Sequence, residues 1–256
     1  MAAPAVSESA RQVVIDGAEL PYVLVRRRGR RRLTLTVEPR HGLRVLAPLR
    51  LSLREIEGFI TRERDWLRER LDEAAAWEQA HPLRRFEDGE TLLLLGERWT
   101  LRVREELGRS RARVERGARF EGPGTITLRL PEGLRAGERR EAAAAALERW
   151  YRRLAKELLS ARVAHWSAAT GLAPTRLSVR DTRSRWGSCS ARGHLSFNWK
   201  IVMAPPAVVD YLVVHELCHL RHLDHSPRFW TLVGRHCPDY ERERRWLRRR
   251  GRELYL

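Results

Sequence analysis

Short runs of apolar residues fill most of the first 50 positions of the chain. Valine, leucine and isoleucine predominate in residues 13–15, 22–25, 33–37 and 43–46, and turn-forming or arginine-rich stretches separate these runs. Aliphatic and β-branched runs that are bounded by turn residues are typical of β-strands. The pattern therefore predicts four strands, which we expect to form an antiparallel meander.

The pattern changes to a helical period after this strand-rich stretch. Ser52 and Glu55 have the spacing of a capping box. An apolar stripe follows at Leu53, Ile56, Ile60, Leu67 and Leu71. Spacings of three, four and seven residues place such side chains on one face of a helix. We predict one long helix here, followed by a connector over residues 74–90.

Strand and helix patterns separate further along the chain. Strand-like runs recur between residues 91 and 130, and the helical period then dominates residues 138–170, with Gly171 in the position of a C-cap. We predict an α+β fold in two parts. Residues 1–134 form a strand-rich N-terminal region with one long helix, and residues 135–256 form a mainly helical domain with a short β-sheet.

The composition adds a strong positive charge. The 256 residues include 50 Lys and Arg against 33 Asp and Glu, which gives a formal net charge of +17. All the basic residues except Lys156 and Lys200 are arginine. Such a chain attracts anions, including nucleic acids and nucleotides. Codon bias explains the choice of arginine equally well, because bidentate binding of phosphate or carboxylate requires arginine only at particular places.

Several classes of protein are excluded by what the sequence lacks. No apolar run approaches the ~20 residues that span a bilayer, and the first residues lack the apolar core of a signal peptide. The three cysteines, Cys189, Cys218 and Cys237, have no C-x-x-C spacing, which argues against a disulfide framework. We expect a globular cytoplasmic protein without a membrane partner, and we interpret the cysteines as packing residues.

A helix that follows Pro206 carries an H-E-x-x-H motif, His215-Glu216-Leu217-Cys218-His219. Histidines at positions i and i+4 lie about one turn apart on the same face, so both imidazoles can reach one metal ion. Glu216 is placed to take a proton from a water molecule on a zinc ion. Catalytic zinc sites have three protein ligands and a water molecule, so a third ligand is expected.

His225 is the leading candidate for the third ligand. In an unbroken helix it would lie about 15 Å further along the axis than His215. The sequence Asp224-His225-Ser226-Pro227 instead predicts a turn, with Ser226 as the N-cap and Pro227 as the first residue of a new helix. We therefore expect the chain to fold back and bring His225 to the metal.

The alternatives to His225 lie on both sides of it. His222 would be about 10 Å along a straight helix from His215 and cannot share its ion. Glu241 or Glu243 would supply a downstream carboxylate as the third ligand. A set of structural histidines without a metal is the remaining possibility.

Four segments of the second half carry a family resemblance. They are RWGSCS at 185–190, LSFNW at 195–199, VHELCHL at 214–220 and HSPRFW at 225–230. Together they resemble the YgjP-like metallopeptidase family, which is related to the SprT and Wss groups of zinc proteases. The resemblance implies a bacterial cytoplasmic protein with a zincin-like catalytic domain. It also implies one zinc ion per chain, held by His215, His219 and His225, with Glu216 as the general base.

The leading hypothesis is a zinc-dependent hydrolase that acts on peptide bonds. Glu216 would take a proton from the attacking water and later deliver it to the leaving amine. Arg183 and Arg185 precede the active helix and would stabilise the developing oxyanion. Asn198 is a further candidate for orienting the substrate.

Two alternatives keep the same site and change the partner. A zinc-bound hydroxide can attack phosphorus, so Arg183, Arg185 and the arginines of residues 26–32 would bind the phosphates of a nucleotide. The resemblance also implies a pyrophosphatase activity on nucleoside triphosphates such as UTP. A DNA-associated SprT-like protease is the second alternative, because the net charge suits a polyanion and arginines crowd residues 242–252.

Overall fold

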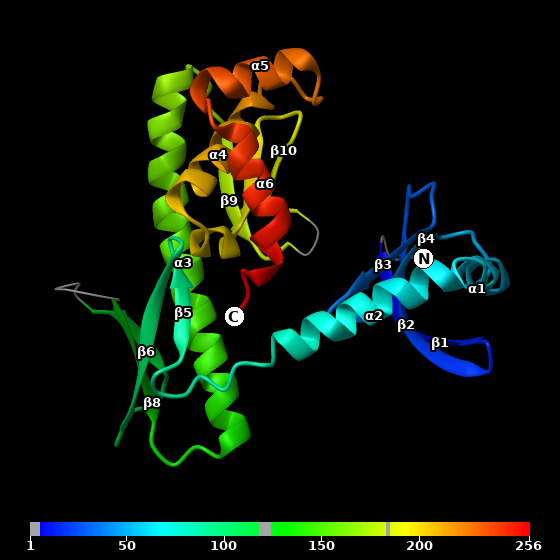
Figure 1. Cartoon of the computed structure of the whole chain (residues 1–256), viewed down its shortest axis with the longest axis horizontal. Coiled ribbons are helices and arrows are strands. Elements are labelled where there is room, and N and C mark those ends of the chain that lie inside the picture. The colour runs from blue at the N-terminus through cyan, green and yellow to red at the C-terminus, as the bar shows by residue number, and fades with distance from the viewer. Residues whose placement is uncertain (1–5, 118–123, 183–184) are drawn as a thin grey trace, which may run out of the picture. The chain divides into compact units, whose positions relative to one another are not determined.

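The computed structural model describes residues 6–117, 124–182 and 185–256 (Figure 1). Over these residues it contains six α-helices, two 3-10 helices and eleven strands in three small mixed sheets. This architecture confirms the predicted α+β class. The chain forms two compact units, Met1–Leu83 and Arg84–Leu256. None of the described helices combines the length and the apolar character that a membrane span requires.

The first unit contains a four-stranded sheet in the order β1-β2-β4-β3. Its strands are β1 (Val6–Ile15), β2 (Ala18–Arg27), β3 (Thr34–Glu38) and β4 (Gly42–Pro48). The outer pairs are antiparallel, but β2 and β4 are parallel neighbours. The predicted antiparallel meander is therefore wrong. The two most apolar strands, β2 and β4, take the centre of the sheet, and β3 becomes an edge strand.

Two helices cover one face of this sheet. The predicted single helix is divided at Glu63 into α1 (Leu53–Arg62) and α2 (Arg64–Ala80). The capping box at the start of α1 is present as predicted. Ile56 and Ile60 of α1 and Leu67 of α2 are buried against the sheet. Helix α2 continues into the stretch predicted as a connector, where alanines at positions 74–76 favour helix.

The second unit begins with a sheet that repeats the topology of the first. Its strands are β5 (Thr91–Leu94), β6 (Glu97–Glu106), β7 (Arg113–Arg116) and β8 (Thr125–Pro131). The order β5-β6-β8-β7 has the same succession of antiparallel, parallel and antiparallel pairs. Each sheet starts with a hairpin whose two turn residues, Asp16-Gly17 or Leu95-Gly96, both have positive φ. Each sheet is followed by a helix.

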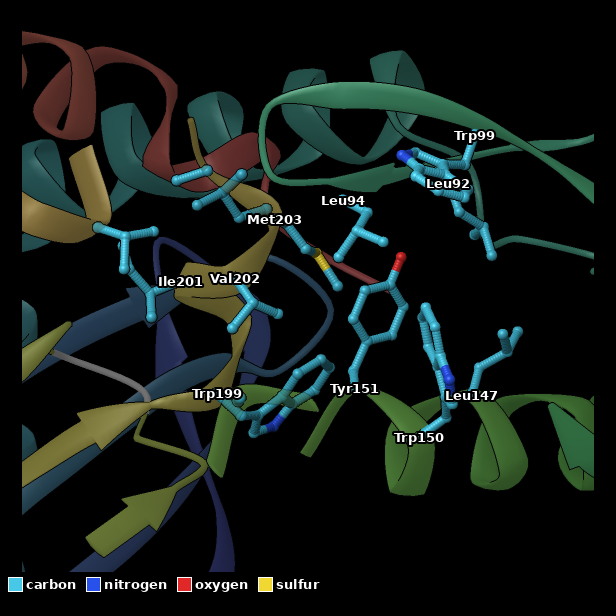
Figure 2. Packing of buried hydrophobic residues seen from close by; sticks show 14 of the residues in the cluster. Leu92, Leu94, Trp99, Leu147, Trp150, Tyr151, Trp199, Ile201, Val202 and Met203 are labelled. Carbon is cyan, nitrogen blue, oxygen red and sulfur yellow. The ribbon is translucent and has the colours of Figure 1, made fainter. Parts of the chain in front are cut away.

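Helix α3 (Ala136–Thr170) joins this second sheet to the rest of its unit and ends at Gly171, which has a φ of 72°. Strand β8 lies against α3, as do η1 (Trp199–Met203) and α4 (Pro206–Cys218) (Figure 1). Figure 2 shows Tyr151 of α3 between Leu94 of the sheet and Trp199. The second sheet therefore shares one hydrophobic core with α3 and α4. The boundary between the compact units accordingly lies between residues 83 and 84, whereas the sequence analysis placed it between 134 and 135.

The β5–β6 turn is fixed to the segment that precedes α4. The backbone N–H groups of Leu95 and Gly96 donate hydrogen bonds to the carbonyls of Val202 (2.8 Å) and Met203 (3.0 Å). A Cβ atom at Gly96 would lie 2.9 Å from Cα of Pro205, so only glycine allows this approach. The turn thereby positions the N-terminus of α4, which carries the H-E-x-x-H motif.

The remaining elements surround α4. A three-stranded sheet contains β9 (Arg176–Arg180), β10 (Gly187–Cys189) and β11 (His194–Asn198), in the order β10-β11-β9. Two helices, α5 (Pro227–His236) and α6 (Tyr240–Arg250), follow α4, and η2 (Gly251–Glu253) ends the regular structure. Helix α4 contacts α3, α5, α6 and β10. The motif-bearing helix is therefore held by neighbours on several sides.

Candidate metal centre

The three histidines expected to bind a metal ion converge. His215 lies in α4, His219 follows its last residue, and His225 lies in the turn before α5. One ligand atom from each of them falls within 4.8 Å of the others. The Nε2 atoms of His215 and His225 are 3.2 Å apart, and two ligands of one tetrahedral zinc ion, each about 2.0 Å from it, are separated by about 3.3 Å. The three imidazoles therefore fit a zinc ion.

The turn that returns His225 to α4 has the predicted local chemistry. Ser226 is the N-cap of α5 and has extended backbone angles, and Pro227 occupies the first position of the helix. The backbone N–H of Ser226 donates to Oδ1 of Asp224 at 3.4 Å. A rigid proline start next to a local Asp-Ser hydrogen bond thus fixes the path of the chain at His225.

His222 contributes its backbone. Nδ1 of His219 lies 2.9 Å from the carbonyl oxygen of His222. Because a carbonyl only accepts, Nδ1 of His219 carries the proton, and Nε2 is left unprotonated and able to bind a metal ion. The side chain of His222 is not part of the three-histidine cluster. Its carbonyl instead orients the imidazole of His219.

The alternative third ligands on α6 are occupied elsewhere. Glu243 is buried and accepts a hydrogen bond from Nε of Arg242 at 2.7 Å. Glu241 is exposed, with Arg245 at 3.6 Å. Among the described residues, neither carboxylate joins the cluster of His215, His219 and His225.

An aromatic side chain that the sequence analysis missed supports the cluster. Phe229 of α5 is fully buried, and its ring centroid lies 4.9 Å from that of His215, 4.5 Å from that of His219 and 4.9 Å from that of His225. Burial lowers the pKa of His215 to about 3, and the nearby imidazoles add to this shift. Burial also lowers the pKa of His219. The imidazoles of His215 and His219 are thus kept neutral, which is the form that binds a metal.

Glu216 is a buried carboxyl group beside this cluster. Only 4% of the residue is exposed, and Oε2 has no hydrogen-bond partner among the described residues. Burial raises the pKa of Glu216 to about 8, and the charge of Arg185 opposes the shift. A carboxyl group whose pKa lies near neutrality can both take and return a proton, as a general base and acid must.

Strand β10 lies directly against this carboxyl group. The side of Gly187 where a Cβ would stand is filled by Oε1, Cδ and Cγ of Glu216. The strand is held there by antiparallel pairing with β11, in which Gly187 is opposite Phe197. The position of the Glu216 carboxyl group is therefore set by α4 on one side and by the backbone of β10 on the other.

A comparison with protein families matches residues 31–250 to the YgjP-like metallopeptidase domain. The chain belongs to the YgjP-like metallopeptidase family. Searches of curated proteins and of solved structures give no significant match. At the level of this family the chain is a metallopeptidase-type hydrolase, and metallopeptidases use a bound metal ion, usually zinc. The three histidines provide a place for such an ion.

The predicted substrate-binding residues of this YgjP-like domain have different surroundings. Arg183 lies outside the described residues. Arg185 is exposed, and its charge acts on Glu216. Asn198 is 4% exposed, and both ends of its amide are used, because Nδ2 donates to the carbonyl of Thr182 at 2.7 Å and Oδ1 accepts from the backbone N–H of Lys200 at 3.0 Å. Asn198 therefore holds the backbone at Thr182 and at the start of η1.

The cysteines of the domain are free thiols. Cys218 is fully buried in an apolar cluster with Phe229 and Val233. Cys189 is half-buried at the end of β10, and burial followed by the charge of Glu216 raises its pKa. Burial also raises the pKa of Cys237 to about 11. Thiols with raised pKa values stay protonated near neutrality, which favours their interpretation as packing residues.

Proposed function

We propose that the protein is a zinc-dependent peptidase in which His215, His219 and His225 hold the ion and Glu216 transfers the proton. The convergence of three imidazoles beside a buried carboxyl group, one oxygen of which has no hydrogen-bond partner among the described residues, carries this proposal. A bound zinc ion would polarise the scissile carbonyl group and lower the pKa of a water molecule.

Glu216 supplies the proton transfers of this mechanism. Its unpartnered Oε2 takes a proton from the attacking water, while Oε1 stays against Gly187. The carboxylic acid then gives the proton to the leaving amine. The raised pKa of Glu216 favours this second step, because the protonated form is accessible near neutral pH.

The edge of the small sheet supports a peptide as the substrate. Within the described sheet, β10 pairs only with β11, so its other edge has no strand partner. Extended peptides commonly bind to such an edge through main-chain hydrogen bonds. Because Gly187 of β10 adjoins Glu216, a peptide that extends this sheet would pass close to the general base.

A nucleoside triphosphate is the second candidate substrate, favoured by the guanidinium group of Arg185 beside Glu216. The arginine run of α6 gives less support to a DNA-associated function. Arg242 is paired with Glu243 and Arg250 with Glu253, so neighbouring carboxylates neutralise part of this charge.

The test compares the wild type with Glu216→Gln, each loaded with zinc. The substrates are casein, with and without double-stranded DNA, and a panel of nucleoside triphosphates. The proposal predicts zinc-dependent cleavage of casein by the wild type alone. Release of pyrophosphate or phosphate without proteolysis would favour the nucleotide instead. Proteolysis that requires DNA would favour the DNA-associated protease.

A further inference from the structure

Arg244 differs from neighbouring arginines on α6 in its contacts. Arg242 is 2.7 Å from a carboxylate oxygen of Glu243, and Arg245 is 3.6 Å from one of Glu241. Arg244 is exposed, and no carboxylate of the described residues pairs with it. Its guanidinium group therefore keeps its hydrogen-bond donors available for a bound ligand.

The guanidinium group of Arg244 is nevertheless held in place. Its Cζ atom lies 4.5 Å from the centroid of the Trp230 ring. Tyr240 stacks on the same ring at 5.2 Å, with an angle of 18° between the ring planes. A guanidinium over an aromatic ring is attracted to the face of the ring, while its N–H groups remain free in its own plane. Arg244 is thus an ordered cation without a counter-ion among the described residues.

Trp230 connects this cation to the metal centre. Its ring stacks on that of His225 with centroids 5.6 Å apart and lies 5.7 Å from that of His215. One indole ring therefore separates the guanidinium group from two of the three histidines.

The balance of charge around the metal centre favours an anionic ligand. A bound zinc ion, Arg185 and Arg244 would together carry more positive charge than the two carboxyl groups beside the cluster, Glu216 and Asp224, carry negative charge. Unbalanced positive charge at a site concentrates anions there and strengthens their binding. A charge-assisted hydrogen bond from a fixed guanidinium group to a carboxylate or phosphate adds to this attraction.

We propose that Arg244, stacked on Trp230, forms a substrate subsite that binds an anionic group, a carboxylate or a phosphate, close to the scissile bond. This inference rests on the proposed function and narrows its substrate class to acidic peptides. The subsite would select substrates by charge, whereas the histidines and Glu216 would act on any bond that reaches them.

The test uses matched peptide libraries that carry glutamate, glutamine or phosphoserine at each position around the cleavage site. The wild type should cleave the glutamate and phosphoserine peptides at least about tenfold faster, in kcat/KM, than the glutamine peptides. In Arg244→Gln this ratio should fall towards one through a rise in KM for the acidic peptides. Arg245→Gln, which removes a paired arginine of the same helix, is the control and should keep the ratio.

Two further readouts separate the possible outcomes. Zinc affinity should be the same in Arg244→Gln and the wild type. A lower zinc affinity, together with an equal loss of kcat/KM on all peptides, would show that Arg244 only supports Trp230. If the wild type cleaves no peptide, the proposed function fails, and the subsite is judged by binding of inorganic phosphate to the zinc-loaded proteins. Weaker phosphate binding by Arg244→Gln than by Arg245→Gln would support the subsite, and equal binding would overturn it.

Discussion

A Cβ atom at Gly187 would lie 2.4 Å from Oε1 of Glu216. It would also lie 2.7 Å from Cγ and 2.8 Å from Cδ of the same side chain. These distances are shorter than ordinary non-bonded contacts between a carbon atom and another heavy atom. Since Gly187 does not have a positive φ, the demand for glycine comes from the Glu216 carboxyl group and not from the backbone conformation.

Gly187→Ala should therefore disturb the general base. We expect kcat for peptide hydrolysis to fall at least about tenfold, because a misplaced general base loses most of its contribution. Zinc affinity should be unchanged, since no metal ligand lies on β10. Steady-state kinetics and a zinc competition assay measure the two effects. Gly137→Ala, at a helical position where nothing lies within 4 Å, is the matched control.

Shortening the glutamate should remove the conflict with alanine at 187. Glu216→Asp withdraws the carboxyl group by one methylene, so Gly187→Ala should cost much less activity in that background than in the wild type. A double-mutant cycle measures this coupling. Independent, additive losses would show that Gly187 acts through the fold of β10 and not through Glu216.

His225→Ala and His222→Ala should differ sharply. Alanine at 225 removes an imidazole of the cluster, whereas alanine at 222 keeps the carbonyl that orients His219. We expect zinc affinity to fall more than about 100-fold in the first variant and less than about tenfold in the second. Competition with a chromogenic chelator measures both. The opposite ranking would refute the assignment of the third ligand.

Asp210 should stabilise the position of α4. Its carboxylate accepts hydrogen bonds from Nε and Nη2 of Arg162 and from Nε1 of Trp166, which lies 3.1 Å away. Asp210→Ala leaves partly buried donors without an acceptor and should lower the free energy of unfolding by about 1–3 kcal/mol. Asp210→Asn retains an acceptor and should lose less. Urea unfolding curves that coincide with the wild type would contradict this role.

The second sheet should lose stability in acid through Glu106. Hydrogen bonds from Arg129 and Arg109 lower the pKa of its carboxyl group. A lowered pKa stabilises the folded state above the unfolded pKa of about 4.3, and this stability disappears as the pH falls through the folded pKa. Glu106→Gln should therefore lower the urea midpoint more at pH 7 than at pH 3. An equal difference at both values would show that the charge is irrelevant.

The parts of the site that depend on local chemistry could be predicted from the sequence. The i and i+4 histidines fix their own spacing on a helix, and Ser226-Pro227 determines the turn that returns His225. The capping box at Ser52 is equally local. The direction of a strand relative to its neighbours is not local, which is why the parallel pairing of β2 and β4 could not be inferred from alternation alone.

Contacts between segments that are distant in the chain could not be predicted from the sequence. Phe229 has the apolar character of any core residue, and only the packing of α5 brings it against three imidazoles. Gly187 resembles a turn glycine until Glu216 is seen beside it. Arg244 cannot be distinguished by composition from Arg242 and Arg245, because what sets it apart is a stacking partner 14 residues earlier, Trp230.

The central claim is tested most directly by titrating zinc into the metal-free protein while peptide hydrolysis is followed. Activity should rise linearly and stop at one zinc ion per chain. Glu216→Gln should bind the same single equivalent and show no hydrolysis. Hydrolysis by Glu216→Gln, activity without added metal, or the absence of zinc binding by the wild type would contradict the account.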